Sequence, residues 1–169
     1  MEISVNKKVF QILCDNTTGV LSRISGLFSR RGYNIESITA GLTADNRFSR
    51  ITIVASGDNE VLDQIEKQVA KLVDVRAITE LEPDVSVYRE LALVKVRADA
   101  RIREEVKSIA DFYKAKIIDV SYDSLIIELT GNSAKIDQFL DLLRDHEILE
   151  LARTGIAGLC RGAKNVIDL

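Results

Sequence analysis

The chain has 169 residues, of which 46% are hydrophobic and 29% charged, a composition typical of a soluble globular protein with its own core. The formal net charge is −3. The densest cluster of basic residues consists of Arg23, Arg30 and Arg31, and a solvated helix face explains it better than contact with nucleic acid does. No apolar run approaches the ~18 to 20 residues that span a bilayer, and residues 1–8 lack a signal-peptide core. We therefore expect a cytoplasmic protein with no nucleic-acid or membrane partner.

Candidate catalytic groups are few. Cys14 and Cys160 are isolated in apolar surroundings and are expected to be buried, reduced thiols. His146 is the single histidine, so it would have to act across long sequence distances. The sequence also lacks a Gly-Lys-Ser/Thr phosphate loop, a Gly-x-Gly-x-x-Gly motif and a His/Cys metal cluster. This pattern favours a chain that has no catalytic, cofactor-binding or metal site of its own.

Hydrophobic periodicity in the first half predicts the order βαββαβ. Strands are expected at residues 9–14, 34–42, 49–55 and 73–81, and helices with apolar faces over 20–28 and 61–72. Thr17 or Thr18 is expected to cap the first helix, and Gly32 is expected to end it. The result is a helix followed by a β-hairpin, a second helix and a closing strand.

The second half repeats this order. Strands are expected at residues 91–96, 116–120, 125–129 and 148–152, and helices with apolar faces over 102–112 and 136–143. Pro83, the only proline, lies between the halves. We therefore predict an α+β protein of two ferredoxin-like modules in tandem, residues 1–82 and 83–169. The glycine-rich stretch 154–162 is expected to be a flexible connection.

Each module is expected to place two helices on one face of a four-stranded antiparallel sheet. The other face and both sheet edges then need cover, so we expect a homodimer that joins the first modules through sheet edges or helix faces. The acidic residues Glu104, Glu105, Asp141 and Asp145 lie on predicted outer helix faces and are expected to be solvated.

Residues 17–38 are the most informative stretch of the chain. Hydroxyl and glycine residues open a helix directly after an apolar run, and the chain leaves this helix through Gly32 into a strand that starts with Asn34. Free backbone N–H groups at a helix N-terminus attract a carboxylate. The pattern therefore indicates a pocket for a small zwitterion such as an amino acid.

The same stretch carries a resemblance to a known family. The segments DNTTGVLSR at residues 15–23 and GLFSRRGYNIES at 26–37 resemble the ACT domain and, more narrowly, the regulatory small subunits of acetolactate synthase. SRITI at 49–53 and ARTG at 152–155 support the match, which spans essentially the whole chain. Departures at Thr17-Thr18, Gly158 and Cys160 are modest and bear on ligand affinity rather than on the assignment.

The resemblance implies an effector site between the first modules of two subunits, where branched-chain amino acids bind, valine above all. The matching positions are Asn16, Gly19, Val20, Asn34 and Ile35. The backbone amides of Gly19 and Val20 would hold the effector carboxylate, and the two asparagines, one from each subunit, would accept from its ammonium group. Val20 and Ile35 would face its aliphatic side chain.

The resemblance also implies a partner, a large catalytic subunit that carries thiamine diphosphate, magnesium and a flavin (FAD). The small subunit would activate this partner, and the effector would limit the activation as feedback inhibition. Two alternatives stay open at this point. One is a stand-alone enzyme that uses the carboxylates of a ferredoxin-like sheet, and the other is an ACT-type amino-acid sensor that acts on another enzyme or regulates transcription.

Overall fold

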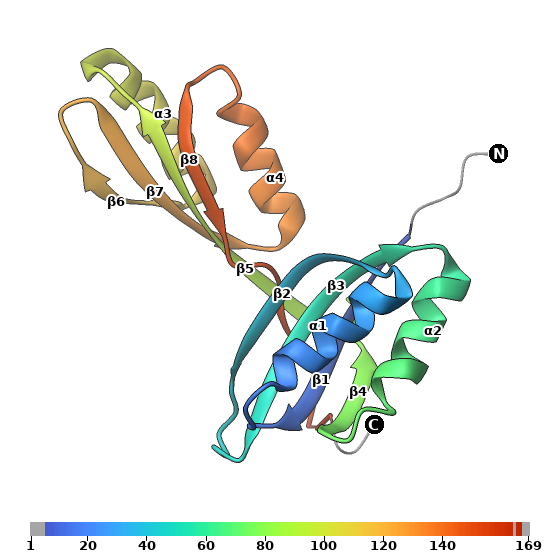
Figure 1. Ribbon diagram of the computed structural model, residues 1–169. Helices are drawn as coiled ribbons and strands as arrows, with labels where there is room; N and C mark the ends of the chain where they lie inside the picture. The colour runs from blue at the N-terminus through green and yellow to red at the C-terminus, as the bar shows by residue number, and fades with distance from the viewer. Residues whose placement is uncertain (1–5, 164, 167–169) are drawn as a thin grey trace. The chain divides into compact units, whose positions relative to one another are not determined.

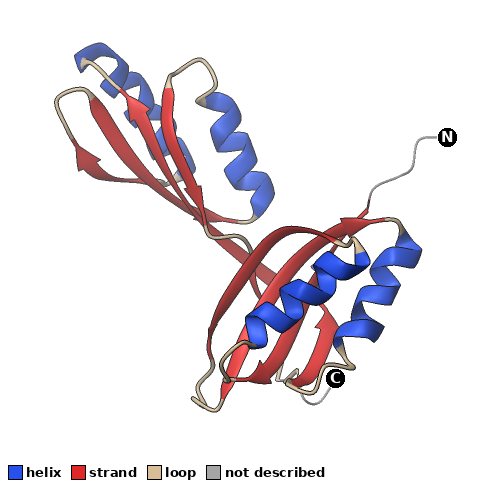
Figure 2. Cartoon of the chain, in the orientation of Figure 1, coloured by secondary structure: helices blue, strands red, loops and turns tan. Residues whose placement is uncertain are grey.

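The computed structural model describes residues 6–163, 165 and 166, which belong to two compact units (Figures 1 and 2). Of the described residues, 6–88 together with 156–163, 165 and 166 form the first unit, and 89–155 form the second. Each unit contains a βαββαβ motif, which confirms the predicted α+β class. No helix in the described part of the chain is long and apolar enough to cross a membrane.

The first unit has two helices on one face of a four-stranded antiparallel sheet (Figure 2). Its elements are β1 (Asn6–Asp15), α1 (Val20–Arg31), β2 (Asn34–Leu42), β3 (Phe48–Gly57), α2 (Asn59–Val69) and β4 (Val75–Glu80). The strand order is β2-β3-β1-β4, so β2 and β4 are the edges. Strands β1 and β3 are longer than predicted, because their ladder continues through polar residues as far as the pair Asp15–Phe48.

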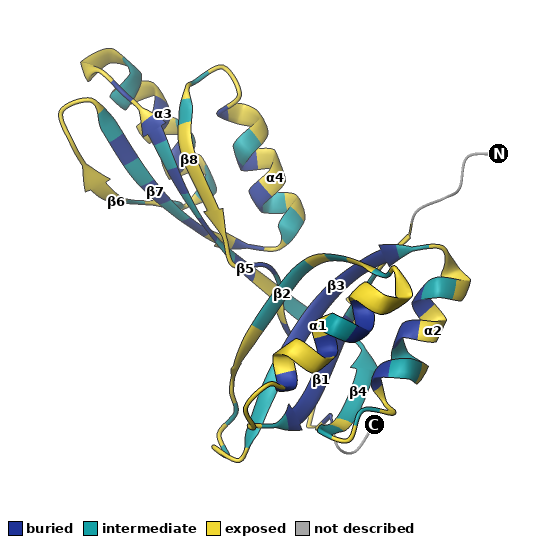
Figure 3. Ribbon diagram, in the orientation of Figure 1, coloured by how far each residue is buried: buried dark blue, intermediate teal, exposed yellow. Residues whose placement is uncertain are grey.

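Along the two central strands, side chains point alternately to the two faces of the sheet, and those on the helix side form the core of the first unit. Its largest fully buried members come from β1, β3 and one face of each helix, and they are Phe10, Ile12, Ile24, Phe28, Ile51, Ile53, Leu62 and Ile65. Burial of one such side chain contributes about 1.5–3 kcal/mol. Figure 3 shows that the central strands are buried and that the outer faces of the helices are exposed. This apolar contact holds both helices on the same face of the sheet.

Helix α1 begins and ends at left-handed glycines. Gly19 is its N-cap, with φ 84°, and Gly32 is its C-cap, with φ 67°. The predicted end at Gly32 is confirmed. The predicted cap at Thr17 or Thr18 is wrong, since no side chain caps this N-terminus and the Thr17 hydroxyl instead lies 3.2 Å from Asp74 Oδ1.

The second unit repeats the arrangement with a sheet in the order β6-β7-β5-β8. Its elements are β5 (Ser86–Arg97), α3 (Ala100–Tyr113), β6 (Lys116–Val120), β7 (Ser124–Gly131), α4 (Ser133–Leu142) and β8 (Ile148–Arg153). Residues 86–88 of β5 lie in the first unit and the rest lie in the second. Alternating residues of β5 and β7 meet both helices in one core, in which Val94, Ile127 and Phe139 are fully buried.

One predicted core position of the second unit is wrong. Phe112 is the last residue of the apolar face predicted over 102–112, but it is 79% exposed. Ile102, Val106 and Ile109 of the predicted face do pack in the core. Tyr113 completes the face in place of Phe112, and its ring packs against Phe139 with 5.5 Å between ring centroids. Successive helical residues point about 100° apart, so only one of residues 112 and 113 can face the sheet.

The two compact units differ from the predicted ranges 1–82 and 83–169. Residues 156–163, 165 and 166, which we call the return segment, lie in the first unit. They contain the short strand β9 (Ala157–Cys160), which pairs with β5. The stretch 154–162 is thus not simply a flexible connection. Four residues are too few to show a periodic pattern, so this strand leaves no signal in the sequence.

Close packing explains why the return segment holds its place. Arg161 N–H donates to Val85 O at 2.8 Å, beside the short 3₁₀ helix η1 (Pro83–Val85). A Cβ at Gly158 would lie 2.7 Å from Leu81 Cδ1 and 3.1 Å from the Tyr88 ring. Only glycine permits this approach without movement of its neighbours.

Candidate functional site

The loop between β1 and α1 carries the predicted effector residues Asn16 and Gly19. Asn16 is exposed, and its side chain ties this loop to the connection between β2 and β3. Its Nδ2 donates to Asn46 O at 3.0 Å, and its Oδ1 accepts from Ser49 Oγ at 3.3 Å. Since a carbonyl oxygen has two lone pairs, Asn16 Oδ1 retains capacity for one further donor.

Gly19 and Val20 have different environments. Gly19 is exposed, and no acceptor for its N–H is found within the described residues. Val20 N–H donates to Thr17 O at a long 3.3 Å, and its side chain is buried in the core of the first unit. The backbone at this helix start therefore faces outward, whereas the Val20 side chain does not offer the expected contact to an aliphatic effector.

A charged cluster that the sequence analysis missed holds this loop. Arg23 Nε donates to Asp74 Oδ2 at 2.6 Å, and the Thr17 hydroxyl lies 3.2 Å from Asp74 Oδ1. A Cβ built on Gly19 would lie 3.0 Å from Arg23 Nη1, so the guanidinium lies beside the exposed turn. Arg23 is thus more than part of a solvated helix face. It brings a positive charge to the point where the α1 dipole is also positive.

Hydrogen bonds within this cluster shift the pKa values of its charged side chains. The Arg23 guanidinium holds the pKa of Asp74 below its ordinary value, and the Thr17 hydroxyl adds to this effect. Asp74 O accepts from Asp15 N–H at 2.8 Å, and Asp15 in turn pairs with Arg76, whose pKa it raises. The residues before and in β4 therefore fasten both sides of the loop.

Asn34 and Ile35 begin β2. Asn34 is exposed, and its Nδ2 donates to Ser56 Oγ at 2.8 Å, while no donor to its Oδ1 is found among residues 6–163, 165 and 166. Ile35 is half-buried and packs against the core of the first unit. Asn34 is consequently positioned to accept a hydrogen bond, whereas much of Ile35 is already covered within its own chain.

The sheet register places the two asparagines at opposite ends of the first unit. Asn16 directly follows Asp15, which pairs with Phe48, whereas Asn34 pairs with Ser56. The stretch of β3 from Phe48 to Ser56 spans about 26 Å at roughly 3.3 Å per residue. One amino acid is much shorter than this distance, so within one chain the structure does not bring Asn16 and Asn34 together.

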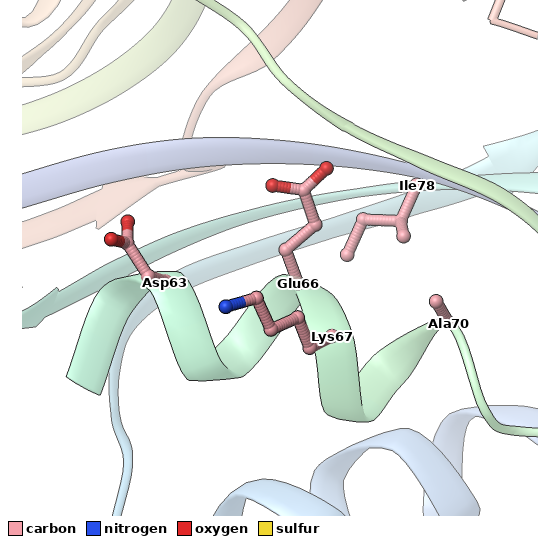
Figure 4. A pocket seen from close by; sticks show the side chains of 5 residues that line it. All are labelled: Asp63, Glu66, Lys67, Ala70 and Ile78. Atoms are coloured by element: carbon pink, nitrogen blue, oxygen red, sulfur yellow. The ribbon is translucent and has the colours of Figure 1, made fainter. Parts of the chain in front are cut away.

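An open depression of about 540 Å³ lies between α2 and β4 (Figure 4). Asp63, Glu66 and Lys67 rise from α2, and Ile78 reaches it from β4. Asp63 also pairs with Lys8 at 3.0 Å. Charges of both signs at an exposed site are typical of a solvated surface rather than of a catalytic pocket.

Other candidate groups agree in part with their predictions. Glu104, Glu105, Asp141 and Asp145 are exposed, as expected. Cys14 is buried, but Cys160 is only half-buried. Within the described residues, no group of three or more His, Cys, Asp or Glu side chains could hold a metal ion.

Both parts of the chain match family models. Residues 10–77 match the model described as "AHAS small subunit-like ACT domain", and residues 89–162 match the model described as "Small subunit of acetolactate synthase". The second match starts where the second unit begins and extends into the return segment.

Relatives and a solved structure agree with these models. The chain is 48% identical to the "Acetolactate synthase isozyme 3 small subunit" of Salmonella typhimurium, over 94% of this chain and 98% of that protein. It is 44% identical to the "Probable acetolactate synthase small subunit" of Methanothermobacter thermautotrophicus, over 98% and 99%. The crystal structure of the acetolactate synthase small subunit from Thermotoga maritima superposes with a TM-score of 0.85 at 39% identity, covering 94% of this chain and 99% of that one. The chain belongs to the family of acetolactate synthase small subunits.

Proposed function

We propose that this chain is a non-catalytic regulatory subunit that binds a branched-chain amino acid, valine in first place, and controls a separate large catalytic subunit of acetolactate synthase. The observation that carries the proposal is the start of α1. Gly19 is exposed there, the first turn has no acidic residue, and Arg23 lies beside it. A carboxylate at this point would meet backbone donors, the helix dipole and a guanidinium together.

The effector site is proposed to lie between the first units of two copies of the chain. The effector carboxylate accepts from the Gly19 amide, and its ammonium group donates to Asn16 Oδ1 of one copy and Asn34 Oδ1 of the other. The separation of these asparagines along β3 supports a shared site, since one copy cannot supply both to the same small ligand. This arrangement makes the homodimer a requirement for binding.

Regulation requires two states of the assembly that differ in effector affinity. In this proposal the small subunit activates the large subunit, and the effector favours a state in which the activation is limited. Thiamine diphosphate, magnesium and the flavin belong to the large subunit. A tenfold preference of the effector for one state corresponds to about 1.4 kcal/mol.

Calorimetric titration tests the effector site. Valine, leucine and isoleucine are titrated into the full chain and into Asn34→Ala, with Asn59→Ala, an exposed asparagine on α2, as the matched control. We expect valine to bind the chain and Asn59→Ala equally and Asn34→Ala much more weakly. Equal valine affinity in all three proteins would remove Asn34 from the site.

Activity assays test the regulatory role. The chain alone should not condense pyruvate, and its addition to a large catalytic subunit should raise turnover in a manner that valine reverses. Turnover by the chain alone would favour an enzyme instead.

A further inference from the structure

The face of the first sheet that points away from the helices is also covered. Gln11 pairs with Thr52 and Leu13 pairs with Arg50 across β1 and β3, so these four side chains share that face. Gln11, Leu13 and Thr52 are at most 5% exposed. The return segment lies over this face, since its Cys160 Sγ accepts from Gln11 Nε2 at 3.4 Å.

A cavity of about 290 Å³, partly open to solvent, remains between this face and the return segment. Gln11 and Arg50 line it from the sheet, and Leu159, Cys160 and Val166 line it from the return segment. Val166 is 4% exposed and supplies an apolar wall. The lining thus combines a guanidinium, an amide, a thiol and aliphatic surface, and it contains no acidic side chain among the described residues.

Among the residues that the structure describes, no carboxylate lines the cavity beside the Arg50 guanidinium. It is half-buried, and burial lowers its pKa below the ordinary arginine value. Within the described residues, this guanidinium donates to the neutral Gln11 Oε1. By contrast, the guanidinium of Arg153, an exposed residue, pairs with the buried Glu90 carboxylate. A partly desolvated cation with only a neutral acceptor favours an anion beside it.

We propose that this cavity binds a short aliphatic monocarboxylate, in contact with Arg50 and with an apolar tail against Leu159 and Val166. The planar guanidinium fork matches a carboxylate, and a single positive charge matches a monoanion better than a phosphate dianion. The volume lies just below the ~300–1,000 Å³ of sites for drug-sized ligands, so the acid must be short. This site belongs to one copy of the chain and is independent of the effector site proposed above.

A matched pair of ligands isolates the role of the charge. The acid 3-methylbutanoate and its amide, 3-methylbutanamide, are titrated into the full chain by calorimetry. We expect the acid to bind at least about tenfold more tightly than the amide. Arg50→Met should remove this preference, whereas Arg47→Met, which changes an exposed arginine paired with Asp45, should leave it intact. Asn34→Ala should also leave it intact, which separates this test from that of the effector site.

Thiol alkylation gives a second readout on the unaltered chain. Cys160 is half-buried at the cavity and Cys14 is fully buried, so iodoacetamide should modify Cys160 first. The acid should slow this reaction and the amide should not, and Cys160→Ser confirms which thiol reacts. Thermal melting of Arg50→Met shows whether that variant is folded.

Three results would overturn the proposal. The first is that the full chain binds the acid and the amide with equal affinity. The second is that a folded Arg50→Met still binds the acid. The third is that the acid binds to Asp168→Asn but not to the unaltered chain. Asp168 lies outside the described residues, and the last result would assign Arg50 to a carboxylate of the chain itself rather than to a free acid.

Discussion

Asp74 shows how a single carboxylate joins segments that are distant in the sequence. It accepts from Arg23 in α1, 51 residues away, and from the Thr17 hydroxyl in the preceding loop. Its side chain is 13% exposed, whereas that of Arg23 is 44% exposed, so solvent screens this ion pair from the Arg23 side. In the proposed site Asp74 touches no effector, and its role is to position the Gly19 turn and the Arg23 guanidinium.

Substitution of this carboxylate should weaken effector binding. We expect Asp74→Asn to lower valine affinity roughly tenfold, because the loop loses the charge that holds Arg23 beside Gly19. Calorimetric titration measures the change. Asp141→Asn, at an exposed acid on α4, should bind valine normally. Normal affinity in Asp74→Asn would show that the loop keeps its shape without the ion pair.

The same carboxylate should contribute to the pH dependence of stability. Because folding lowers the pKa of Asp74, its contribution to stability is present above the unfolded pKa of about 3.9 and is lost as the pH falls through the lower folded pKa. We expect the difference in unfolding free energy between the native chain and Asp74→Asn to shrink from about pH 6 to about pH 3. Urea unfolding at several pH values measures it, and a difference that stays constant would contradict the assignment.

At the level of elements, α1 differs from the other helices in how it begins. α2, α3 and α4 begin after Asp58, Asp99 and Asn132, whose side chains accept from backbone N–H groups of the first turn. α1 begins after Gly19 with no side-chain cap. A capping side chain would occupy the donors that an anion needs, so the missing cap leaves this helix start open to a ligand.

Alanine at two glycines of this segment should have opposite effects. Gly19→Ala forces a left-handed conformation on a residue with a Cβ and should lower the unfolding free energy by about 1 kcal/mol. Gly26→Ala, inside α1, should raise it by roughly 0.5–1 kcal/mol through helix propensity. Urea unfolding measures both changes. Valine binding should weaken in Gly19→Ala alone, and a loss in Gly26→Ala as well would point to a general disturbance of the helix.

At the level of the whole molecule, the register of the first sheet decides how a site can be assembled. Asn16 and Asn34 lie at opposite ends of β3, and both are exposed. A second copy related by twofold symmetry can place its Asn34 end against the Asn16 end of the first. In the proposed dimer, this arrangement would create two identical effector sites.

This symmetry predicts complementation between two defective variants. Asn16→Ala and Asn34→Ala should each bind valine weakly. In a mixed dimer, however, one of the two effector sites receives a native Asn16 from one subunit and a native Asn34 from the other. Refolding the two variants together should therefore restore sites that bind valine with native affinity. Calorimetric titration measures how many such sites are present. Each variant refolded alone is the control. If both asparagines served a site within one chain, the mixture would bind no better than its components.

Local patterns explain which features could be predicted. The strand at 34–42 and the helix end at Gly32 follow from alternation and from the conformational freedom of glycine, which involve neighbouring residues alone. The start of α1 was predicted less well, because the Thr17 hydroxyl prefers Asp74, a residue far away in the sequence. Strand β9 was missed because it is short and depends on Gly158 packing against Leu81.

The amino-acid sequence by itself determined the two βαββαβ modules, their cores and the exposed glycine turn, because hydrophobic periodicity and glycine conformation act over a few residues. The tertiary structure decided which distant groups meet. It pairs Arg23 with Asp74 and buries the Val20 side chain in the core. It also brings Cys160 into contact with Gln11, beside the Arg50 guanidinium. These contacts depend on strand register and chain reversal, which no single segment encodes.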